Sequence, residues 1–444
     1  MGRELYEIEN DELRLRLDPT AGWVRDMEGA GEKSLLAGPG DPGTLSEFHD
    51  AGFHPQCLTV YVNTRCNLRC DYCYDSGNRT RPERNVSLNA VRAAAEVVAA
   101  RCKAMTRPFV LGFHGGNEPL LSRALVGGII ACCRKVAAGH GLQVLSFCTT
   151  NGVIDRAAAE WAARTFDGIT LSWDGCREIH DMHRRHADGR PSYEEVAETA
   201  DVFRSIDANR VTIRVTVTRN SVDRMRETAE FFHDLGFRTI HFFPVYRAAN
   251  GTLDEKLAVD QSSFVFNFLK ARSWAKPRAM RLIYSGTRWS ENHDRFCMLR
   301  QNNLTMTPDG YLTACFLATS NHEQENGRFV YGSYDERTGK LSIDRPKLAS
   351  IVARLRHVPL QCEDCYNRSH CAKNCPSLCP LSEPEHDAEF ECTVFKWLGL
   401  ANIIEAAGHV VELSTREECI DYFTNIRISR VPADRCDERV RHIN

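Results

Sequence analysis

The sequence predicts an α/β fold, a partial (β/α)6 TIM-like barrel followed by a cysteine-rich C-terminal domain. Between residues 56 and 245 one unit repeats: a short run rich in β-branched residues, a loop, and an Ala-rich stretch with the helical period. Strands that alternate with helices through short connections form parallel sheets with right-handed crossovers. With 444 residues, 43% of them hydrophobic, the chain can bury a large core and is expected to divide into two or three units.

Six such units predict an open barrel with six strands and helices between them. The strands are expected at Cys57–Asn63, Phe109–His114, Val144–Thr149, Ile169–Trp173, Val211–Thr218 and Ile240–Val245. The helices are expected at Leu88–Cys102, Leu120–Ala138, Ala157–Arg164, Tyr193–Ser205 and Met225–Leu235. We interpret the Ala-rich helices as scaffold on the outside of the sheet, because alanine is the strongest helix former.

The rest of the chain divides by composition. Residues 1–55 combine alternating apolar runs with a Gly/Pro-rich stretch, which predicts a β-hairpin extension and a linker. The barrel is expected over residues 56–250 and a linker with one helix, Ser262–Trp274, over residues 251–296. The cysteine-rich domain is expected over residues 297–395 and a helical tail over residues 396–444.

Charge and composition exclude several classes of partner. Lys and Arg total 56 against 59 for Asp and Glu, a formal net charge of -3, which offers no general field for nucleic acid or an anionic membrane. The first residues lack the apolar core of a signal peptide, and no apolar run reaches the roughly 18 residues that cross a bilayer. Nineteen cysteines without an export signal indicate metal ligation in a reducing, cytoplasmic environment.

Cys66, Cys70 and Cys73 form a CxxxCxxC triplet directly after the first predicted strand, with no obvious fourth ligand. An iron-sulfur cube held by three cysteines keeps one iron open to an outside molecule, whereas structural zinc has four protein ligands. The loops at the C-terminal ends of barrel strands carry the chemistry in βα-barrels, so the position favours a functional centre. A zinc knuckle or three unrelated buried cysteines are the alternatives for the triplet alone.

This spacing, with Tyr72 just before the third cysteine, resembles the radical S-adenosylmethionine (SAM) enzymes. The resemblance implies that SAM chelates the open iron of a 4Fe-4S cluster. One electron from the cluster then splits SAM to a 5′-deoxyadenosyl radical, which takes a hydrogen atom from the substrate. It also implies a flavodoxin- or ferredoxin-type electron donor.

Motifs at successive strand ends resemble the SAM-binding segments of that family. A Gly-Gly-Asn-Glu segment follows the second strand, Thr-Asn the third, and Ser-Trp-Asp the fourth. Arg184 and Arg214 are candidates for the SAM carboxylate, because a guanidinium fork suits that group; a solvated surface arginine is the alternative for Arg184. The residues implied in SAM binding are Gly115, Gly116, Asn117, Glu118, Thr150, Asn151, Ser172, Asp174, Arg184 and Arg214.

Seven C-terminal cysteines resemble the SPASM domain, a module of radical SAM maturases that holds two auxiliary 4Fe-4S clusters. The resemblance implies one cluster on Cys362, Cys365, Cys371 and Cys392, and another on Cys297, Cys315 and Cys375, making three 4Fe-4S clusters in all. The fourth ligand of the latter is open between Cys379, His293 and no protein ligand. Spacing alone also allows a zinc ribbon.

Auxiliary clusters favour oxidation or cross-linking. We expect a maturase that acts on a ribosomally made precursor peptide and installs a thioether, C–C or C–O cross-link, or an oxidised side chain. Phe316 stands where sulfatase-maturing enzymes have an Asp, which disfavours formylglycine formation. The alternatives are a dehydrogenase or epimerase acting on a sugar or aminocyclitol, and a zinc-stabilised scaffold without catalysis. The candidates for proton transfer are Tyr246, His293, Asp294 and Asp309.

Overall fold

The computed structural model describes residues 5–29, 31–35, 53–73, 75, 82–115, 117–245, 254–289, 302–315, 327–356, 360–372 and 389–431. Eight residues singled out from the sequence lie outside these ranges: Gly116, Tyr246, His293, Asp294, Cys297, Phe316, Cys375 and Cys379. Within the described ranges, no helix is long and apolar enough to span a membrane.

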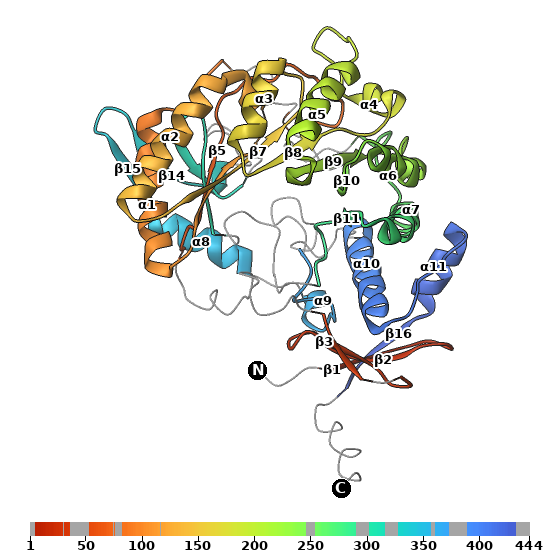
Figure 1. Cartoon of the computed structure of the whole chain (residues 1–444). Helices are drawn as coiled ribbons and strands as arrows, with labels where there is room; N and C mark the ends of the chain where they lie inside the picture. The colour runs from red at the N-terminus through yellow and green to blue at the C-terminus, as the bar shows by residue number, and fades with distance from the viewer. Residues whose placement is uncertain are drawn as a thin grey trace.

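The main sheet has eleven strands in the order β11-β10-β9-β8-β7-β6-β5-β12-β13-β14-β15 (Figure 1). Neighbours from β11 to β12 are all parallel, and the pairs beyond β12 are antiparallel. The strands are β5 (Cys57–Val60), β6 (Phe109–Phe113), β7 (Val144–Thr150), β8 (Gly168–Ser172), β9 (Val211–Val217), β10 (Thr239–Pro244), β11 (Arg281–Ile283), β12 (Asn303–Met306), β13 (Tyr311–Thr313), β14 (Val330–Asp335) and β15 (Lys340–Ile343).

The six predicted strands are confirmed as β5 to β10. The short strands β11 and β12 extend the parallel part at its two ends, β11 beside β10 and β12 beside β5. The sequence did not reveal them, because runs of three and four residues are too short to show a strand period.

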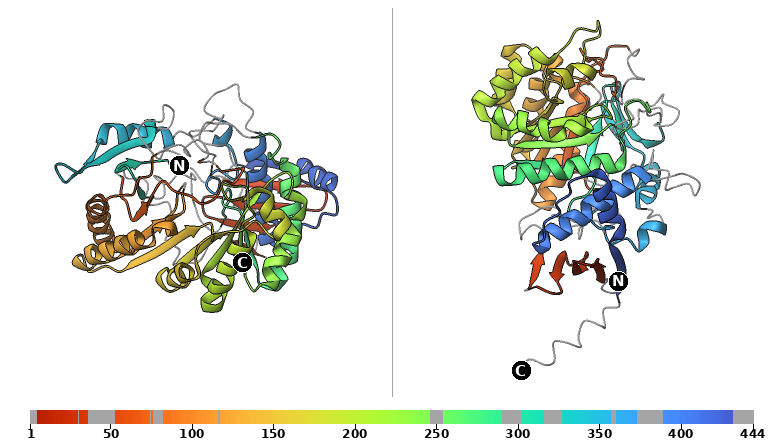
Figure 2. Two further views of the ribbon diagram at one scale, coloured as in Figure 1. Left: turned by 90° about the horizontal axis from the view of Figure 1, so that it is seen from above. Right: turned by 90° about the vertical axis from the view of Figure 1, so that its right-hand side faces the viewer.

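Helices cover one face of the parallel sheet, as Figure 2 shows from two further directions. The predicted helices are confirmed, including the one expected at Ser262–Trp274, and Ser87 caps the first of them through its hydroxyl. They are α1 (Leu88–Met105), α2 (Arg123–Gly139), α3 (Arg156–Thr165), α5 (Tyr193–Asp207), α6 (Met225–Asp234) and α7 (Gln261–Ala275). The short helix α4 (Arg177–His183) was not predicted. Alternate residues of each strand are buried beneath these helices, as the pattern of β9 illustrates.

The opposite side of the sheet, which carries Thr149, Thr170, Thr212, Arg214 and His241, is called the inner face below. These residues alternate with the buried ones and are partly exposed. Polar side chains therefore line a face that the helices leave uncovered, which is where a parallel sheet can receive a ligand.

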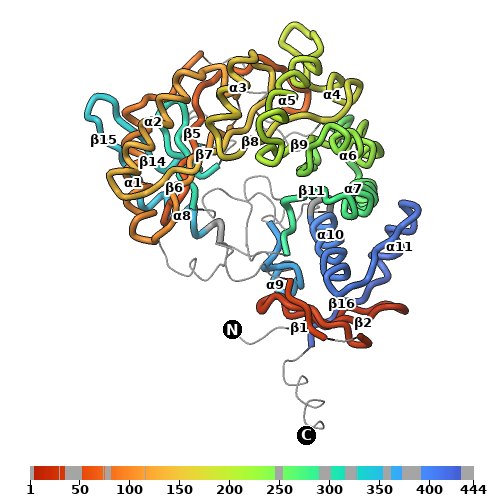
Figure 3. Tube along the Cα trace, viewed as in Figure 1, coloured from red at the N-terminus to blue at the C-terminus, as the bar shows by residue number. Residues whose placement is uncertain are grey.

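A second, antiparallel sheet joins the two ends of the chain, and Figure 3 shows the red and blue segments side by side. Its order is β16-β1-β2-β3-β4, from β1 (Leu5–Glu9), β2 (Arg14–Asp18), β3 (Trp23–Asp26), β4 (Glu32–Ser34) and β16 (Arg427–Val431). The sequence predicted a β-hairpin extension within residues 1–55 and a helical tail over residues 396–444, whereas the structure pairs strands from both segments in one sheet. The edge of β1 would present unpaired backbone groups, and β16 satisfies them.

The C-terminal helices are α8 (Arg345–Arg356), α9 (Leu360–Glu363), α10 (Glu389–Ala407) and α11 (Arg416–Asn425). Helix α10 is tied to α7 by an ion pair between Arg272 Nη2 and Glu405 Oε1 at 2.6 Å, with both side chains largely buried. The boundary expected at residue 396 falls inside α10. The domain limits as a whole stay a prediction.

Candidate functional site

The loop that carries Cys66, Cys70 and Cys73 leaves the C-terminal end of β5 and is fastened to the segment after α4. The backbone N–H of Arg69 donates to Arg185 O at 2.7 Å, and that of Asp71 donates to His183 O at 3.1 Å. These backbone bonds on both sides of Cys70 fix the loop, and none of them uses a cysteine thiol.

The three thiols lie within electrostatic reach of one another. Cys70 is buried, Cys73 is partly buried, and Cys66 is exposed at the loop surface. Protein atoms nevertheless crowd the Cys66 thiol, and this desolvation raises its pKa to about 12, with Glu118, Cys70 and Cys73 raising it further. Asn151 Nδ2 also lies 3.7 Å from Cys66 Sγ. Thiols in such surroundings stay protonated until a metal displaces the proton.

This donor set suits a cluster better than a single ion. Among the described residues, no group of three or more His, Cys, Asp or Glu side chains could hold one metal ion. A four-iron cube places the thiols that bind its corners farther apart than the ligands of one ion. Three cysteines on one loop match the ligand set of a 4Fe-4S cluster that keeps one iron open.

The buried side chain of Glu118 accepts hydrogen bonds from the segment that carries Asn151. Its side chain is 1% exposed, and Oε1 accepts from Leu120 N at 3.0 Å and from Thr150 Oγ1 at 2.9 Å. Oε2 accepts from Asn151 N at 2.6 Å. Burial raises the pKa of Glu118 to about 7, although the three donors and Arg184 act in the opposite direction. Both carboxylate oxygens are engaged inside the protein, so Glu118 acts as a support.

Asp174 and Arg184 meet at Tyr72, the aromatic residue of the cysteine motif. The Tyr72 hydroxyl donates to Asp174 Oδ2, and Arg184 Nη1 donates to the Tyr72 oxygen at 3.0 Å. Asp174 Oδ1 accepts from Thr216 N at 2.9 Å, and burial raises the pKa of this carboxyl. Arg184 is 7% exposed, so the alternative of a solvated surface arginine is wrong. The group ties the cysteine loop to β8 and β9.

Ser172, Arg214 and His241 lie side by side on the inner face, in register on β8, β9 and β10. The Arg214 guanidinium lies over the Phe243 ring, 5.0 Å from its centroid. Desolvation, reinforced by Arg214 and Arg288, lowers the pKa of His241 to about 3. This imidazole is neutral at physiological pH and is a weak base, so it can hydrogen-bond a ligand without adding charge.

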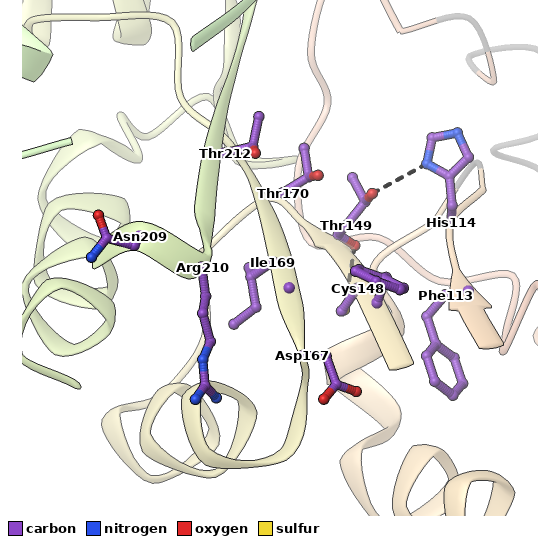
Figure 4. A pocket seen from close by; sticks show the side chains of 13 residues that line it. Phe113, His114, Cys148, Thr149, Asp167, Ile169, Thr170, Asn209, Arg210 and Thr212 are labelled. Atoms are coloured by element: carbon purple, nitrogen blue, oxygen red, sulfur yellow. Dashed lines mark hydrogen bonds between the residues drawn. The ribbon is translucent and has the colours of Figure 1, made fainter. Parts of the chain in front are cut away.

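A cavity of about 300 Å³ hollows the inner face toward the N-terminal ends of β8 and β9 (Figure 4). The hydroxyls of Thr149, Thr170 and Thr212 come from three adjacent strands, and Phe147 forms part of the wall. His114 Nδ1 lies 3.3 Å from Thr149 Oγ1, and desolvation, then Arg214, lowers the pKa of His114 to about 4. Asp167 and Arg210 also line the cavity, together with Phe113 and Ile169, so its lining combines hydroxyl, charged and apolar side chains.

The C-terminal cysteines within the described ranges fall into two places. Cys365, Cys371 and Cys392 surround Tyr366, whose pKa is raised well above its usual range by burial and then by these three thiols. Cys365 N donates to Cys362 O at 3.3 Å, so the CxxC pair forms one tight turn. No disulfide joins any two described cysteines. Four thiols grouped around one turn and the start of α10 fit a second cluster.

Cys315 follows β13, two residues after its last residue, Thr313. It is 8% exposed, and its backbone N–H donates to Thr313 Oγ1 at 3.1 Å. Asp309, in the turn before β13, forms an ion pair with Arg84 at 2.7 Å. Its part in proton transfer stays a prediction, as do the ligands assigned with Cys315.

The sequence interpretation missed Asn63, which is fully buried at the end of β5. Its Nδ2 donates to Glu118 O at 3.1 Å, its Oδ1 accepts from Arg65 N at 2.8 Å, and Asn117 donates to its carbonyl. This side chain joins the cysteine loop to the Asn117–Glu118 segment. The only feature of the sequence that could have identified Asn63 is its position, as a single amide residue between an apolar strand and a cysteine motif, where an apolar residue or a turn residue is common.

Comparisons with known proteins agree with this site. A family model described as the radical SAM superfamily matches residues 60–242. The "Cysteine-type anaerobic sulfatase-maturating enzyme" of Clostridium perfringens is 24% identical over 183 residues, 41% of this chain and 49% of that protein. The "GTP 3',8-cyclase" of Limosilactobacillus fermentum is 25% identical over 284 residues, 58% of this chain and 78% of that protein. The chain thus spans about half the length of the sulfatase-maturating relative.

Solved structures share the fold. The structure described as native anSMEcpe with bound AdoMet has a TM-score of 0.62 and 17% identity, over 84% of this chain and 100% of that chain. Streptococcus suis SuiB bound to precursor peptide SuiA has a TM-score of 0.54 and 13% identity, over 78% of this chain and 77% of that chain.

Proposed function

We propose that this chain is a radical SAM peptide maturase; a family model described as the radical SAM superfamily matches its residues 60–242. It cleaves SAM reductively, abstracts hydrogen from a ribosomally made peptide, and leaves a cross-link or an oxidised side chain. The observation that carries this proposal is the loop of Cys66, Cys70 and Cys73 at the C-terminal end of β5, which has the CxxxCxxC spacing and is anchored by backbone hydrogen bonds. We take the parallel part of the main sheet, with its helices, to be the partial barrel that the six βα units predict.

A 4Fe-4S cluster on these cysteines would supply the electron for cleavage, received from a flavodoxin- or ferredoxin-type donor. The chain's own residues bind and orient. Gly115, at φ +152°, packs against the Tyr61 ring, which a Cβ at this position would overlap. Ser172 and Arg214 are placed in register to receive the polar end of SAM. Glu118 and Asp174 act as supports as well, because their oxygens accept hydrogen bonds from other residues of the chain.

The substrate class rests on the relatives. The similar structures include one described as native anSMEcpe with bound AdoMet and Cp18Cys peptide, and SuiB with precursor peptide SuiA. The inner-face cavity is lined by threonine hydroxyls, by apolar side chains and by Asp167 and Arg210, and this lining offers polar and apolar contacts to a peptide segment. The cysteines around Tyr366 support an auxiliary cluster, which would accept an electron from the substrate radical or bind the substrate. A cluster that generates the radical, together with an auxiliary cluster, would support the formation of a thioether, C–C or C–O bond in the substrate.

The test is anaerobic reconstitution with iron and sulfide, followed by SAM and a reductant. The triple variant C66A/C70A/C73A is expected to form no 5′-deoxyadenosine in mass spectrometry while it keeps its auxiliary iron. The matched control is C132A, because Cys132 is a partly buried helix residue outside the site. It should form the nucleoside as the wild type does.

Continued SAM cleavage by the triple variant would refute the assignment of the site. Zinc in place of iron in the wild type would favour the scaffold without catalysis. A sugar or aminocyclitol substrate is tested separately: stimulation of SAM cleavage by such a molecule, and not by candidate peptides, would move the chain to the dehydrogenase class.

A further inference from the structure

Asn367 lies inside the cysteine loop of residues 360–372, and its side chain joins this loop to two other segments. The residue is 1% exposed. Its Nδ2 donates to the Phe395 carbonyl at 2.9 Å, and its Oδ1 accepts from Thr287 Oγ1 at 3.2 Å. A buried amide with a partner at each end holds those partners at a fixed separation.

Both segments that Asn367 contacts are linked to cysteines of the proposed auxiliary cluster. Phe395 lies on α10, three residues after Cys392. Thr287 follows β11 and forms an isolated backbone bridge with Cys371. Asn367 lies in the loop that carries Cys362 and Cys365. Its amide connects this loop to α10, which carries Cys392, and to Thr287, whose backbone pairs with Cys371.

Gly399, one turn further along α10, provides the space for this amide. A Cβ at Gly399 would lie 2.9 Å from Asn367 Oδ1 and 3.0 Å from its Nδ2, closer than packed atoms allow. Glycine weakens the interior of a helix, so its presence here calls for a packing reason. The close approach of α10 to Asn367 supplies that reason.

The neighbouring residue strengthens the same connection. The Tyr366 hydroxyl donates to the Lys396 carbonyl at 2.6 Å, directly beside the carbonyl that Asn367 uses. The two side chains thus hold two successive carbonyls of α10 against the loop. Outer-shell hydrogen bonds of this kind orient metal ligands and tune the centre they hold.

We propose that Asn367 is a positioning residue for the auxiliary cluster of Cys362, Cys365, Cys371 and Cys392. It sets the separation of the cysteine loop from α10, and with it the geometry and reduction potential of the cluster. The inference rests on the proposed function, since the cluster belongs to that proposal. Asn367 itself need not touch the cluster.

The experiment compares N367A and G399A in the C66A/C70A/C73A background, so that only auxiliary iron remains. Iron and sulfide per chain, the EPR spectrum of the reduced protein and a redox titration are measured for each. N367A is expected to lose about four irons per chain, the content of one 4Fe-4S cluster, or to keep them with a changed spectrum and potential. G399A, which displaces the amide without removing it, should shift the spectrum and potential as well.

The matched control is N267A. Asn267 is also a buried amide, on α7, and its Nδ2 donates to Asp223 Oδ1 at 3.0 Å and to Ser263 O at 2.9 Å. N267A should lower the unfolding midpoint and leave iron, EPR spectrum and potential unchanged.

The inference would be overturned if N367A and G399A both had the same iron content, EPR spectrum and reduction potential as the parent C66A/C70A/C73A variant. If N367A shows no cooperative unfolding, G399A decides alone: unchanged readouts in that variant overturn it. If the parent background itself holds no auxiliary iron, the proposed auxiliary cluster is wrong and the inference falls with it, which separates the two failures.

Discussion

The buried carboxyl of Glu118 makes the stability of this protein depend on pH in a way that one substitution isolates. Burial raises the folded-state pKa of Glu118 from 4.5 to about 7. A raised carboxyl pKa stabilises the fold below the unfolded value, and this contribution is lost as pH rises through the folded value. Between pH 5 and pH 8 the two pKa values predict a loss of about 2.5 kcal/mol from this group.

The substitution E118Q removes the titration and keeps the shape. Its amide oxygen can still accept from Leu120 N and Thr150 Oγ1, while its NH2 group would face the Asn151 N–H, at a cost of about 1–3 kcal/mol at any pH. Urea unfolding of the metal-free protein at pH 5 and pH 8 measures both effects. Wild type should lose about 2.5 kcal/mol more than E118Q over this range, because all other groups titrate equally in the two proteins.

Exposed Glu160 provides the control. Its ion pair with Arg156 lies on the surface, and such pairs contribute about 0–1 kcal/mol. E160Q should therefore follow the wild type at both pH values. If wild type and E118Q respond identically to pH, the burial argument for Glu118 is refuted, whatever the size of the constant difference between them.

Three further outcomes are expected. G152A should lose about 2–4 kcal/mol in urea unfolding, because Gly152 has φ +76° and a Cβ would lie 2.6 Å from Leu171 Cδ1. G141A, at φ +73° with open space around it, should lose only about 1–2 kcal/mol, and equal losses would contradict the steric argument. Y72F should lose about 1–3 kcal/mol in the metal-free protein, because Asp174 and Arg184 lose their shared partner; an unchanged midpoint would speak against this network. The lowered pKa of His241, about 3, means that the fold loses stability as pH falls below about 6.5 toward that value, and H241N should reduce this acid sensitivity in thermal unfolding. The same slope in both proteins would show that His241 is not its source.

The local pattern of the sequence determined the six strands β5 to β10, their helices and the position of the cysteine loop. These features repeat within short windows, and hydrophobic period and cysteine spacing report them directly. The order of the strand-end motifs on successive strands also placed Glu118, Asn151 and Asp174 on one edge, because parallel strands end on the same side of a sheet.

Only the tertiary structure decided which protein groups those side chains contact. Glu118, Asp174 and Arg184 stay predicted as SAM-binding residues, and their hydrogen bonds also join them to Asn151, Thr216 and Tyr72. Each partner lies more than thirty residues away, so no local window contains the pair.

The pairing of β16 with β1 and the hydrogen bond from Asn367 to Phe395 are likewise contacts between residues that lie far apart in the sequence. The sequence specified which residues could hold a cluster, because ligand chemistry is carried by residue type and spacing. It did not specify which polar groups support the ligands, because a hydrogen bond needs only a donor and an acceptor that folding brings together, and such groups occur throughout the chain.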